Sequence, residues 1–513
     1  NSGTISITVT YDEAVDVVTS GGVPGFGLDS GGTANYVSGT GTTAIRFDYV
    51  VAGGQNSTDL DTLENINLNS GTILDSIGNA ADLTMPTGGQ AGALALNRDI
   101  EIDTTGPTIT NVDTSTSDGT YNSGTISITV TYDEAVDVVT SGGVPGFGLD
   151  SGGTANYVSG TGTTAIRFDY VVAGGQDSTD LDTLANINLN SGTMLDSTGN
   201  AADLTMPTGG QAGALALNRD IEIDTTGPTI TNVDTSTTDG TYNSGTISIT
   251  VTYDEAVDVV TSGGVPGFGL NSGGTANYVS GTGTTAIRFD YVVAGGQDHA
   301  DLDTLENINL NSGTMLDSTG NAADLTMPTG GQAGALALNA EIEIDTQGPT
   351  ITNVDTSTSD GTYNSGTISI TVTYDEAVDV VTSGGGPGCG LDSGGTANYV
   401  SGTGTTAIRF DYVVAGGQND TDLDTLENIN LNSGTMLDST GNAADLTMPT
   451  GGQAGALALN RDIEIDTTGP TITNVDSSTS DGTYNSGTIS ITVTYDEAVD
   501  VVTSGGVPGF GLD

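Results

Sequence analysis

The chain is built from a segment that returns every 121 residues with almost no change. The opening NSGTISITVTYDEAVDV begins again at Asn122, Asn243, Asn364 and Asn485, and residues 1–29 are identical to residues 485–513. A unit of this length can bury a hydrophobic core of its own, unlike a short solenoid repeat. Both ends fall inside the unit, so we expect a window cut from a longer array. The expected domains are residues 1–103 (without a first strand), 104–224, 225–345, 346–466 and 467–513, the last being only the start of a repeat.

Strict alternation of apolar and polar residues predicts the fold class. In the second copy, Ile126, Ile128, Val130 and Tyr132 share one face of a strand, with Thr and Ser on the other. Such alternation is typical of a half-buried antiparallel strand. A similar strand is expected at residues 164–172, a long final strand at 215–223, and shorter ones at 108–112, 136–140, 155–159 and 187–190. About seven strands separated by Gly-rich turns predict an all-β, immunoglobulin-like β-sandwich in each repeat.

The charge of the chain excludes several classes of partner. It has 65 acidic residues against 7 basic ones, all of them arginine, and a net charge of −58. Nucleic acid and anionic membrane surfaces need a basic face, so neither is expected to bind. No apolar run is long enough to span a membrane. Acidic chains are often disordered or carry a halophile-type surface, but the regular alternation favours folded domains. So much like charge destabilises a compact state unless cations neutralise it.

Short junctions join the expected domains. Asp224-Thr-Thr-Gly-Pro228 follows the final strand, and the same junction recurs at residues 103–107, 345–349 and 466–470. Proline ends strand pairing and stiffens the crossing. Because only two or three residues remain as linker, successive domains should touch end to end.

Acidic residues concentrate beside these junctions, which suggests a metal site. On the final strand, carboxylates at alternate positions leave one face about 6.6 Å apart. Carboxylate oxygens are the ligands that Ca²⁺ prefers, whereas a solvated strand face is the alternative. This first group comprises Asp99, Glu101 and Asp103; Asp220, Glu222 and Asp224; Glu341, Glu343 and Asp345; and Asp462, Glu464 and Asp466.

Two further acidic motifs recur, and ordinary turns are the alternative for both. A Tyr-Asp-Glu loop is expected to follow the first core strand, at Asp12 and Glu13, Asp133 and Glu134, Asp254 and Glu255, Asp375 and Glu376, and Asp496 and Glu497. The motif Leu-Asp-x-x-Gly-Asn resembles half of a calcium loop, at Asp75 and Asn79, Asp196 and Asn200, Asp317 and Asn321, and Asp438 and Asn442. A weaker pair lies at Asp59 and Asp61 and their copies.

These strings together resemble a known family. The segments DTTGPTI, SGTI-x-ITV-x-Y-DE, YVSGTGTTAIRFDYVV and INLNSGT-x-LD-x-x-GN are similar to the immunoglobulin-like (cadherin-like) repeats of giant bacterial extracellular adhesin and fibre proteins. The resemblance covers every copy. It implies a stalk or fibre at the cell surface, many of whose relatives are stiffened by Ca²⁺ near domain junctions.

We therefore expect an extracellular structural protein, a calcium-stiffened row of domains. The alternative is a multivalent binder of polysaccharide or ice through outward threonine rows. The row could be a single-file stalk, or copies could associate sideways into a filament. An enzyme is not expected, because His299 is the single histidine and no catalytic triad can repeat. Cys389 replaces a phenylalanine of the other copies and has no partner for an intrachain disulfide.

Overall fold

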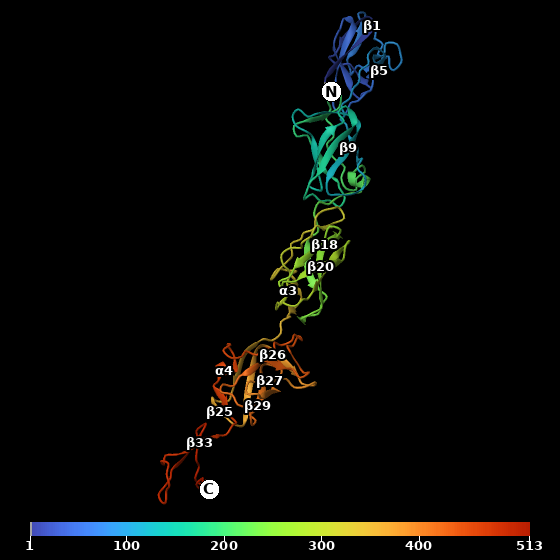
Figure 1. The fold of residues 1–513 in the computed structure, drawn as a ribbon. Coiled ribbons are helices and arrows are strands. Elements are labelled where there is room, and N and C mark those ends of the chain that lie inside the picture. The colour runs from blue at the N-terminus through green and yellow to red at the C-terminus, as the bar shows by residue number, and fades with distance from the viewer. Residues whose placement is uncertain (1–2) are drawn as a thin grey trace. The chain divides into compact units, whose positions relative to one another are not determined.

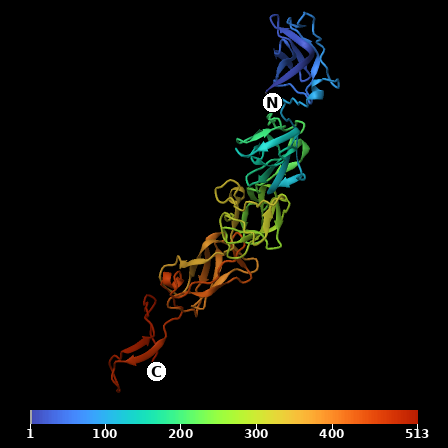
Figure 2. The ribbon, with the colours of Figure 1, turned by 90° about the horizontal axis from the view of Figure 1, so that it is seen from above.

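The computed structural model describes residues 3–513, apart from the side chain of Glu64. It consists of strands and four single-turn helices. By contact it divides into two compact units. The first runs to Thr229 and includes residues 255–258 and 315–324; the second comprises residues 230–254, 259–314 and 325–513. Figures 1 and 2 show separate groups of strands for successive repeats. The predicted all-β tandem arrangement, with sandwich-like sheets repeating at 121 residues, is confirmed.

The second repeat shows the plan that the others follow. Its strands lie in the order β13-β10-β11-β12-β9, and β7 and β14 pair with different parts of β9. A parallel pair, β8 with β15, lies outside this sheet. The elements are β7 (Ile109–Thr114), β8 (Gly119–Tyr121), β9 (Gly124–Val139), β10 (Gly146–Leu149), β11 (Thr154–Ser159), β12 (Thr163–Val172), β13 (Thr183–Asn188), β14 (Thr193–Leu195), α2 (Leu215–Asn218) and β15 (Ile221–Ile223).

The first repeat starts at the counterpart of β9. Its elements are β1 (Thr4–Val18), β2 (Gly25–Leu28), β3 (Thr33–Ser38), β4 (Thr42–Val50), β5 (Thr62–Asn67), β6 (Thr72–Asp75) and α1 (Leu94–Asn97). The third repeat has β16 (Ile230–Thr235), β17 (Gly240–Tyr242), β18 (Thr246–Val260), β19 (Gly267–Gly269), β20 (Thr275–Ser280), β21 (Thr284–Val292), β22 (Thr314–Leu316), α3 (Leu336–Asn339) and β23 (Ile342–Ile344).

The fourth repeat again has the full plan. It contains β24 (Ile351–Thr356), β25 (Gly361–Tyr363), β26 (Thr367–Val381), β27 (Gly388–Leu391), β28 (Thr396–Ser401), β29 (Thr405–Val413), β30 (Thr425–Asn430), β31 (Thr435–Leu437), α4 (Leu457–Asn460) and β32 (Ile463–Ile465). The remaining residues form one hairpin, β33 (Ile472–Ser477) with β34 (Ile491–Tyr495).

The core of the second repeat lies between the inward face of the large sheet and the segment that carries α2 and β15. Ile126, Ile128 and Val130 of β9 are buried beside Phe168 of β12, as their alternation predicts. Leu215 of α2 is buried in the same cluster. Burial of large side chains of this kind contributes about 1.5–3 kcal/mol each, so each complete repeat has its own source of stability.

Two predictions about the strands are wrong. The residues expected to form one long final strand, 215–223, instead make the single turn α2 and the short β15. The Arg219 N–H donates to the Leu215 carbonyl, which is a helical bond, and this leaves Leu217 60% exposed. The expected turn at Asp133 and Glu134 is also absent, because β9 continues to Val139 with an irregular register between Thr131 and Val136.

Candidate metal centre

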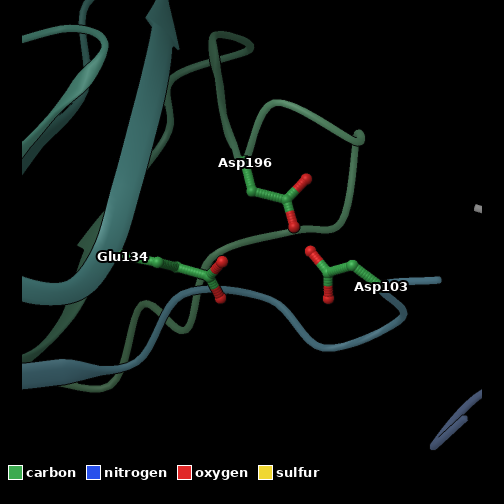
Figure 3. A group of neighbouring side chains, drawn as sticks. All are labelled: Asp103, Glu134 and Asp196. Carbon is green, nitrogen blue, oxygen red and sulfur yellow. The ribbon is translucent and has the colours of Figure 1, made fainter. Parts of the chain in front are cut away.

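Three acidic groups of identical composition recur at the junctions. In the first, Asp103 comes from the linker, Glu134 from β9 and Asp196 from the turn after β14. One carboxylate oxygen of each lies within 4.8 Å of the others, and Figure 3 shows the three side chains pointing toward one another. Each group lies inside one compact unit. The other two groups are Asp224, Glu255 and Asp317, and Asp345, Glu376 and Asp438.

Carboxylate, hydroxyl and backbone oxygens of the junction lie around the side-chain nitrogen of Asn200. The Asn200 Nδ2 lies 2.7 Å from the Asp196 Oδ2 and 2.9 Å from the Thr198 Oγ1. It also lies 3.0 Å from the Thr105 carbonyl oxygen and 3.1 Å from that of Asp103. A side-chain amide has only two N–H hydrogens to share among these four oxygens. The oxygens thus converge more densely than one amide can satisfy.

The same convergence recurs around Asn442. Its Nδ2 lies 2.8 Å from the Asp438 Oδ2, 2.8 Å from the Thr440 Oγ1 and 3.0 Å from the Asp345 carbonyl oxygen. The repeated geometry shows that the oxygen cluster is a property of the junction.

The carboxylates of these groups repel one another. Burial, followed by the charges of Asp103 and Asp196, raises the pKa of Glu134 above its ordinary value. Burial and the charge of Asp317 raise the pKa of Asp224 in the same way. Burial also acts to raise the pKa of Asp196, but hydrogen bonds from Asn200 and Thr198 outweigh it and hold that pKa low. The junction is therefore a strongly negative site that a cation would stabilise.

The linker is held on its N-terminal side by the preceding repeat. The Thr104 N–H donates to the Asn56 Oδ1 over 2.8 Å, and the Thr104 Oγ1 accepts from the Gly54 N–H over 2.9 Å. Asn56 is the asparagine of a glycosylation-type sequon, and its copy Asp177 accepts from Thr225 in the same manner. The residue at this position therefore acts as a cap for the linker.

On its C-terminal side the linker packs against the next repeat. A Cβ atom added to Gly106 would lie 1.8 Å from the Ala201 carbonyl oxygen, so only glycine fits there. The Pro107 carbonyl accepts from the Asp203 N–H over 2.8 Å. The Thr108 N–H donates to the Asp133 Oδ1 over 2.7 Å, which holds this predicted ligand outside the acidic group.

A second contact holds successive repeats together, at the backbone of the turn that carries one acid of the group. Within the second unit, the Asn243 Nδ2 donates to the Thr440 carbonyl over 2.8 Å. Within the first, Asn122 makes the same bond to Thr319 over 2.7 Å. The acidic turn is therefore approached from two places on the preceding repeat.

Several other predicted ligands lie near one another or near one of the three groups without completing a further group among residues 3–513. In the first repeat, Asn79 donates to Asp75 over 2.6 Å beside Asp12 and Glu13, but no linker aspartate joins them among residues 3–513. Asp466 lies close enough to Glu497 to contribute, after burial, to its raised pKa. The charge of Glu101 acts weakly on Glu134 in the same direction, after burial and the nearer acids.

The remaining upstream strand acids and first acids of the Tyr-Asp-Glu motif stand outside the three groups. Glu222, Glu343 and Glu464 are exposed on their strands. Each accepts a hydrogen bond from a threonine hydroxyl of the paired strand, as Glu222 does from Thr120. Also outside are Asp99, Asp220, Glu341 and Asp462, which come just before the final strand or its counterpart, and Asp254, Asp375 and Asp496, of which Asp375 and Asp496 accept from Thr350 and Thr471.

The threonine at the centre of the turn was not among the predicted site residues. The Thr198 hydroxyl lies 3.3 Å from the Asp103 Oδ2, and Thr440 lies equally near Asp345. The signal was available in the change from Ile77 to Thr198 between copies. The linker carbonyl oxygens beside Asn200 were not predicted either, because the position of a backbone oxygen leaves no trace in residue type.

Two other sequence features have structural roles. Asp182, of the weaker acid pair, is buried and accepts from the Gly209 and Ala216 N–H groups. The outward Ser and Thr row of β9 was the surface expected to bind polysaccharide or ice in the alternative hypothesis. Ser127 and Thr131 of this row are half-buried: the Thr131 carbonyl accepts from the Thr110 hydroxyl, and the Ser127 hydroxyl donates to Asp169.

The comparisons with known proteins leave the role open. No family model matches the sequence, and no curated protein matches it either. A solved structure of a marsupial T cell receptor is similar over 64% of this chain and 98% of the receptor chain, with 8% sequence identity and a TM-score of 0.18. A likeness this weak carries no functional argument. None of the described helices is long and apolar enough to cross a membrane.

Proposed function

We propose that this chain is an extracellular structural protein in which bound Ca²⁺ stiffens a row of immunoglobulin-like domains. In this proposal the row is a surface fibre or adhesin stalk of the bacterial type, with a mechanical rather than catalytic role. The observation that carries it is the acidic group at three successive junctions, assembled each time from the linker, a strand and a turn.

The chemistry of the donors favours Ca²⁺. Around Asp103, Glu134 and Asp196 the available atoms are carboxylate, carbonyl and hydroxyl oxygens. Ca²⁺ takes six to eight such oxygens in flexible geometry, whereas Zn²⁺ prefers nitrogen and sulfur. Extracellular modules bind Ca²⁺ at about 10⁻⁴–10⁻³ M, and that range suits a protein whose joints become rigid after export.

A cation here would act on the joint rather than on a single domain. Asp103 belongs to the linker that Thr104 ties to the first repeat, whereas Glu134 and Asp196 belong to the second. Cancelling the repulsion between them therefore fixes the linker to the second repeat. The linker's packing through Gly106 already restricts the joint, so the cation needs only to remove the residual repulsion.

Calorimetric titration of Ca²⁺ into the 513-residue chain tests the proposal. We expect three equivalent sites, one for each complete group. Small-angle scattering should show the chain lengthen and stiffen on Ca²⁺ addition and relax on chelation. Neither binding nor a change in dimensions at millimolar Ca²⁺ would sink the proposal.

A matched pair of variants separates site loss from general charge effects. Glu134→Gln removes one carboxylate of a complete group, and we expect the titration to lose one of its three sites. Glu13→Gln makes the same change at the equivalent position of the first repeat, where no linker aspartate completes the group among the described residues. We expect it to leave all three sites. Equal effects of both variants would contradict the assignment.

A further inference from the structure

One threonine of the acidic turn is bonded from two directions. Where the third repeat meets the fourth, the Thr440 hydroxyl lies 2.7 Å from the Asp438 Oδ1 and 3.3 Å from the Asp345 Oδ2. Both carboxylates belong to the acidic group. The Thr440 carbonyl oxygen accepts from the Asn243 Nδ2 over 2.8 Å, and all four residues lie in one compact unit. Thr440 of the fourth repeat is therefore attached to the third through both Asp345 and Asn243.

The parallel pair β17–β23 brings these two attachments to the same end of the third repeat. Tyr242 pairs with Ile344 at the end of this ladder, and the Asp345 N–H donates to the Tyr242 carbonyl over 3.1 Å. Asn243 and Asp345 therefore leave side by side from neighbouring strands, which lie about 4.8 Å apart. An attachment through the linker alone would let the fourth repeat turn about it. A second attachment from a separate strand opposes that turning.

The Asn243 amide is oriented so that its N–H groups face the turn. The Ser244 hydroxyl donates to the Asn243 Oδ1 over 3.0 Å, which leaves the Nδ2 for the Thr440 carbonyl. A Cβ atom added to Gly441, the next residue of the turn, would lie 3.5 Å from the Asn243 Nδ2. The asparagine therefore approaches the turn beside a residue that carries no side chain.

The same arrangement occurs in the first compact unit. The Asn122 Nδ2 donates to the Thr319 carbonyl over 2.7 Å, and the Ser123 hydroxyl donates to the Asn122 Oδ1 over 3.0 Å. The Thr319 hydroxyl lies 2.7 Å from the Asp317 Oδ1 and 3.4 Å from the Asp224 Oδ2, both in the acidic group of that junction. The double attachment is thus a property of the repeat rather than of one copy.

We propose that Asn122 and Asn243 couple cation binding in the acidic group to the orientation of the repeat that precedes it. This inference rests on the proposed function, because it concerns the same sites. A cation bound by Asp345 and Asp438 would draw the two carboxylates together and fix Thr440, whose hydroxyl contacts both. The Thr440 carbonyl that Asn243 binds would then be fixed as well. By linkage, the bond from Asn243 raises the affinity for the cation by the same factor by which the cation strengthens the bond.

Calorimetric titration of Ca²⁺ into the 513-residue chain measures this coupling. The net contribution of one hydrogen bond corresponds to a change of about two- to tenfold in an equilibrium constant. We therefore expect Asn243→Ala to weaken one of the three sites by about that factor without abolishing it. Ser244→Ala should have a smaller effect in the same direction, because Asn243 keeps its bond to Thr440. The control is Asn277→Ala, which makes the same change at an exposed asparagine of β20 in the same repeat and should leave all three affinities unchanged.

Distances between spin labels distinguish a coupling residue from one that only stabilises its repeat. Labels at Val292→Cys and Val413→Cys would stand on exposed positions of the third and fourth repeats, whereas the native Cys389 is buried. In saturating Ca²⁺ the chain with asparagine at position 243 should give one narrow distance distribution, and chelator should broaden it. Asn243→Ala should keep a broader distribution even when every site is saturated, and Asn277→Ala should not.

The results separate this inference from the proposed function. A wild-type chain that binds no Ca²⁺ would contradict both. If the wild-type chain binds Ca²⁺ and its distribution narrows, but Asn243→Ala matches it in affinity and in width, the coupling alone is wrong. A purely structural role would lower the melting temperature of Asn243→Ala equally in chelator and in Ca²⁺ with the affinity unchanged, and that result would also overturn the coupling.

Discussion

The fourth repeat should be the least stable complete repeat, because its core has lost a phenylalanine. In the second and third repeats, Phe147 and Phe268 pack against a second phenylalanine with ring centroids 4.9 Å apart. The fourth has Cys389 in this place, fully buried against the same strands. Truncating a buried phenylalanine to alanine costs about 3–5 kcal/mol. Cysteine keeps part of the volume, so we expect Cys389→Phe to stabilise this repeat by about 2–3 kcal/mol.

Calorimetry of the full chain in chelator measures this effect. For a domain of this size each kcal/mol moves the melting temperature by about 3–5 °C, so the transition of the fourth repeat should rise by roughly 6–15 °C in Cys389→Phe. Burial raises the pKa of the Cys389 thiol to about 12, so the thiol reacts only after its repeat opens. Alkylation during heating of the wild-type chain therefore identifies which transition belongs to the fourth repeat.

The reverse change supplies the control. Phe268→Cys should create a second weak transition, in the third repeat, of similar size. If Cys389→Phe melts at or below the wild-type temperature, the pocket has closed around the smaller side chain. The inference from the sister repeats would then be wrong.

Three further changes test the junctions and the turns. Gly348→Ala should destabilise the fourth repeat by about 1–3 kcal/mol, because its Cβ would lie 1.9 Å from the Ala443 carbonyl oxygen, whereas Gly416→Ala adds a Cβ in open space and should shift the melting temperature little. Ser191→Gly should raise the melting temperature by stabilising the repeat by about 0.5–1 kcal/mol, since Ser191 has a φ of 71° that glycine adopts more readily. Burial, then Asp345 and Asp438, raises the pKa of Glu376 in the folded junction, so in chelator that carboxylate makes the junction less stable as the pH rises above its ordinary pKa. In chelator, Glu376→Gln should therefore lose less stability than the wild type as the pH rises towards neutral. The same change should weaken Ca²⁺ binding. Thermal melts at several pH values measure this, and melting temperatures of variant and wild type that change with pH in parallel would contradict the reasoning.

The strands could be predicted because their signal is local. Ile126, Ile128 and Val130 alternate with polar residues, and the structure buries the expected face. The course of residues 215–223 could not be predicted in this way, because Leu215 and Leu217 fit a strand pattern equally well. Their helical turn depends on contacts with the first strand of the repeat, such as that of Asn218 with Val112. Period-two patterning carries no information about such contacts.

The three carboxylates at each junction came from three separate motifs, and strand geometry explains which acids of those motifs meet. Asp133 and Glu134 are neighbours on one strand, so their side chains leave opposite faces. The Asp133 side chain accepts a hydrogen bond from Thr108, the residue after the linker, and Glu134 joins the acidic group. Because successive side chains of a strand leave opposite faces, Asp133 and Glu134 are not expected to bind the same cation.

The final-strand acids are limited by distance instead. Asp220, Glu222 and Asp224 leave the same face, but each step of two residues moves the side chain about 6.6 Å along the strand. The three ligand oxygens of a group lie within 4.8 Å of one another, and Asp224 is the acid of this run that belongs to such a group. The turn containing Asp317 contacts the end of the strand, where Asp224 lies. Asp224 is thus the ligand candidate, while the upstream acids add negative charge without a place in the group. The same reasoning makes the junction aspartate, rather than the run of acids before it, the residue whose replacement should abolish a site.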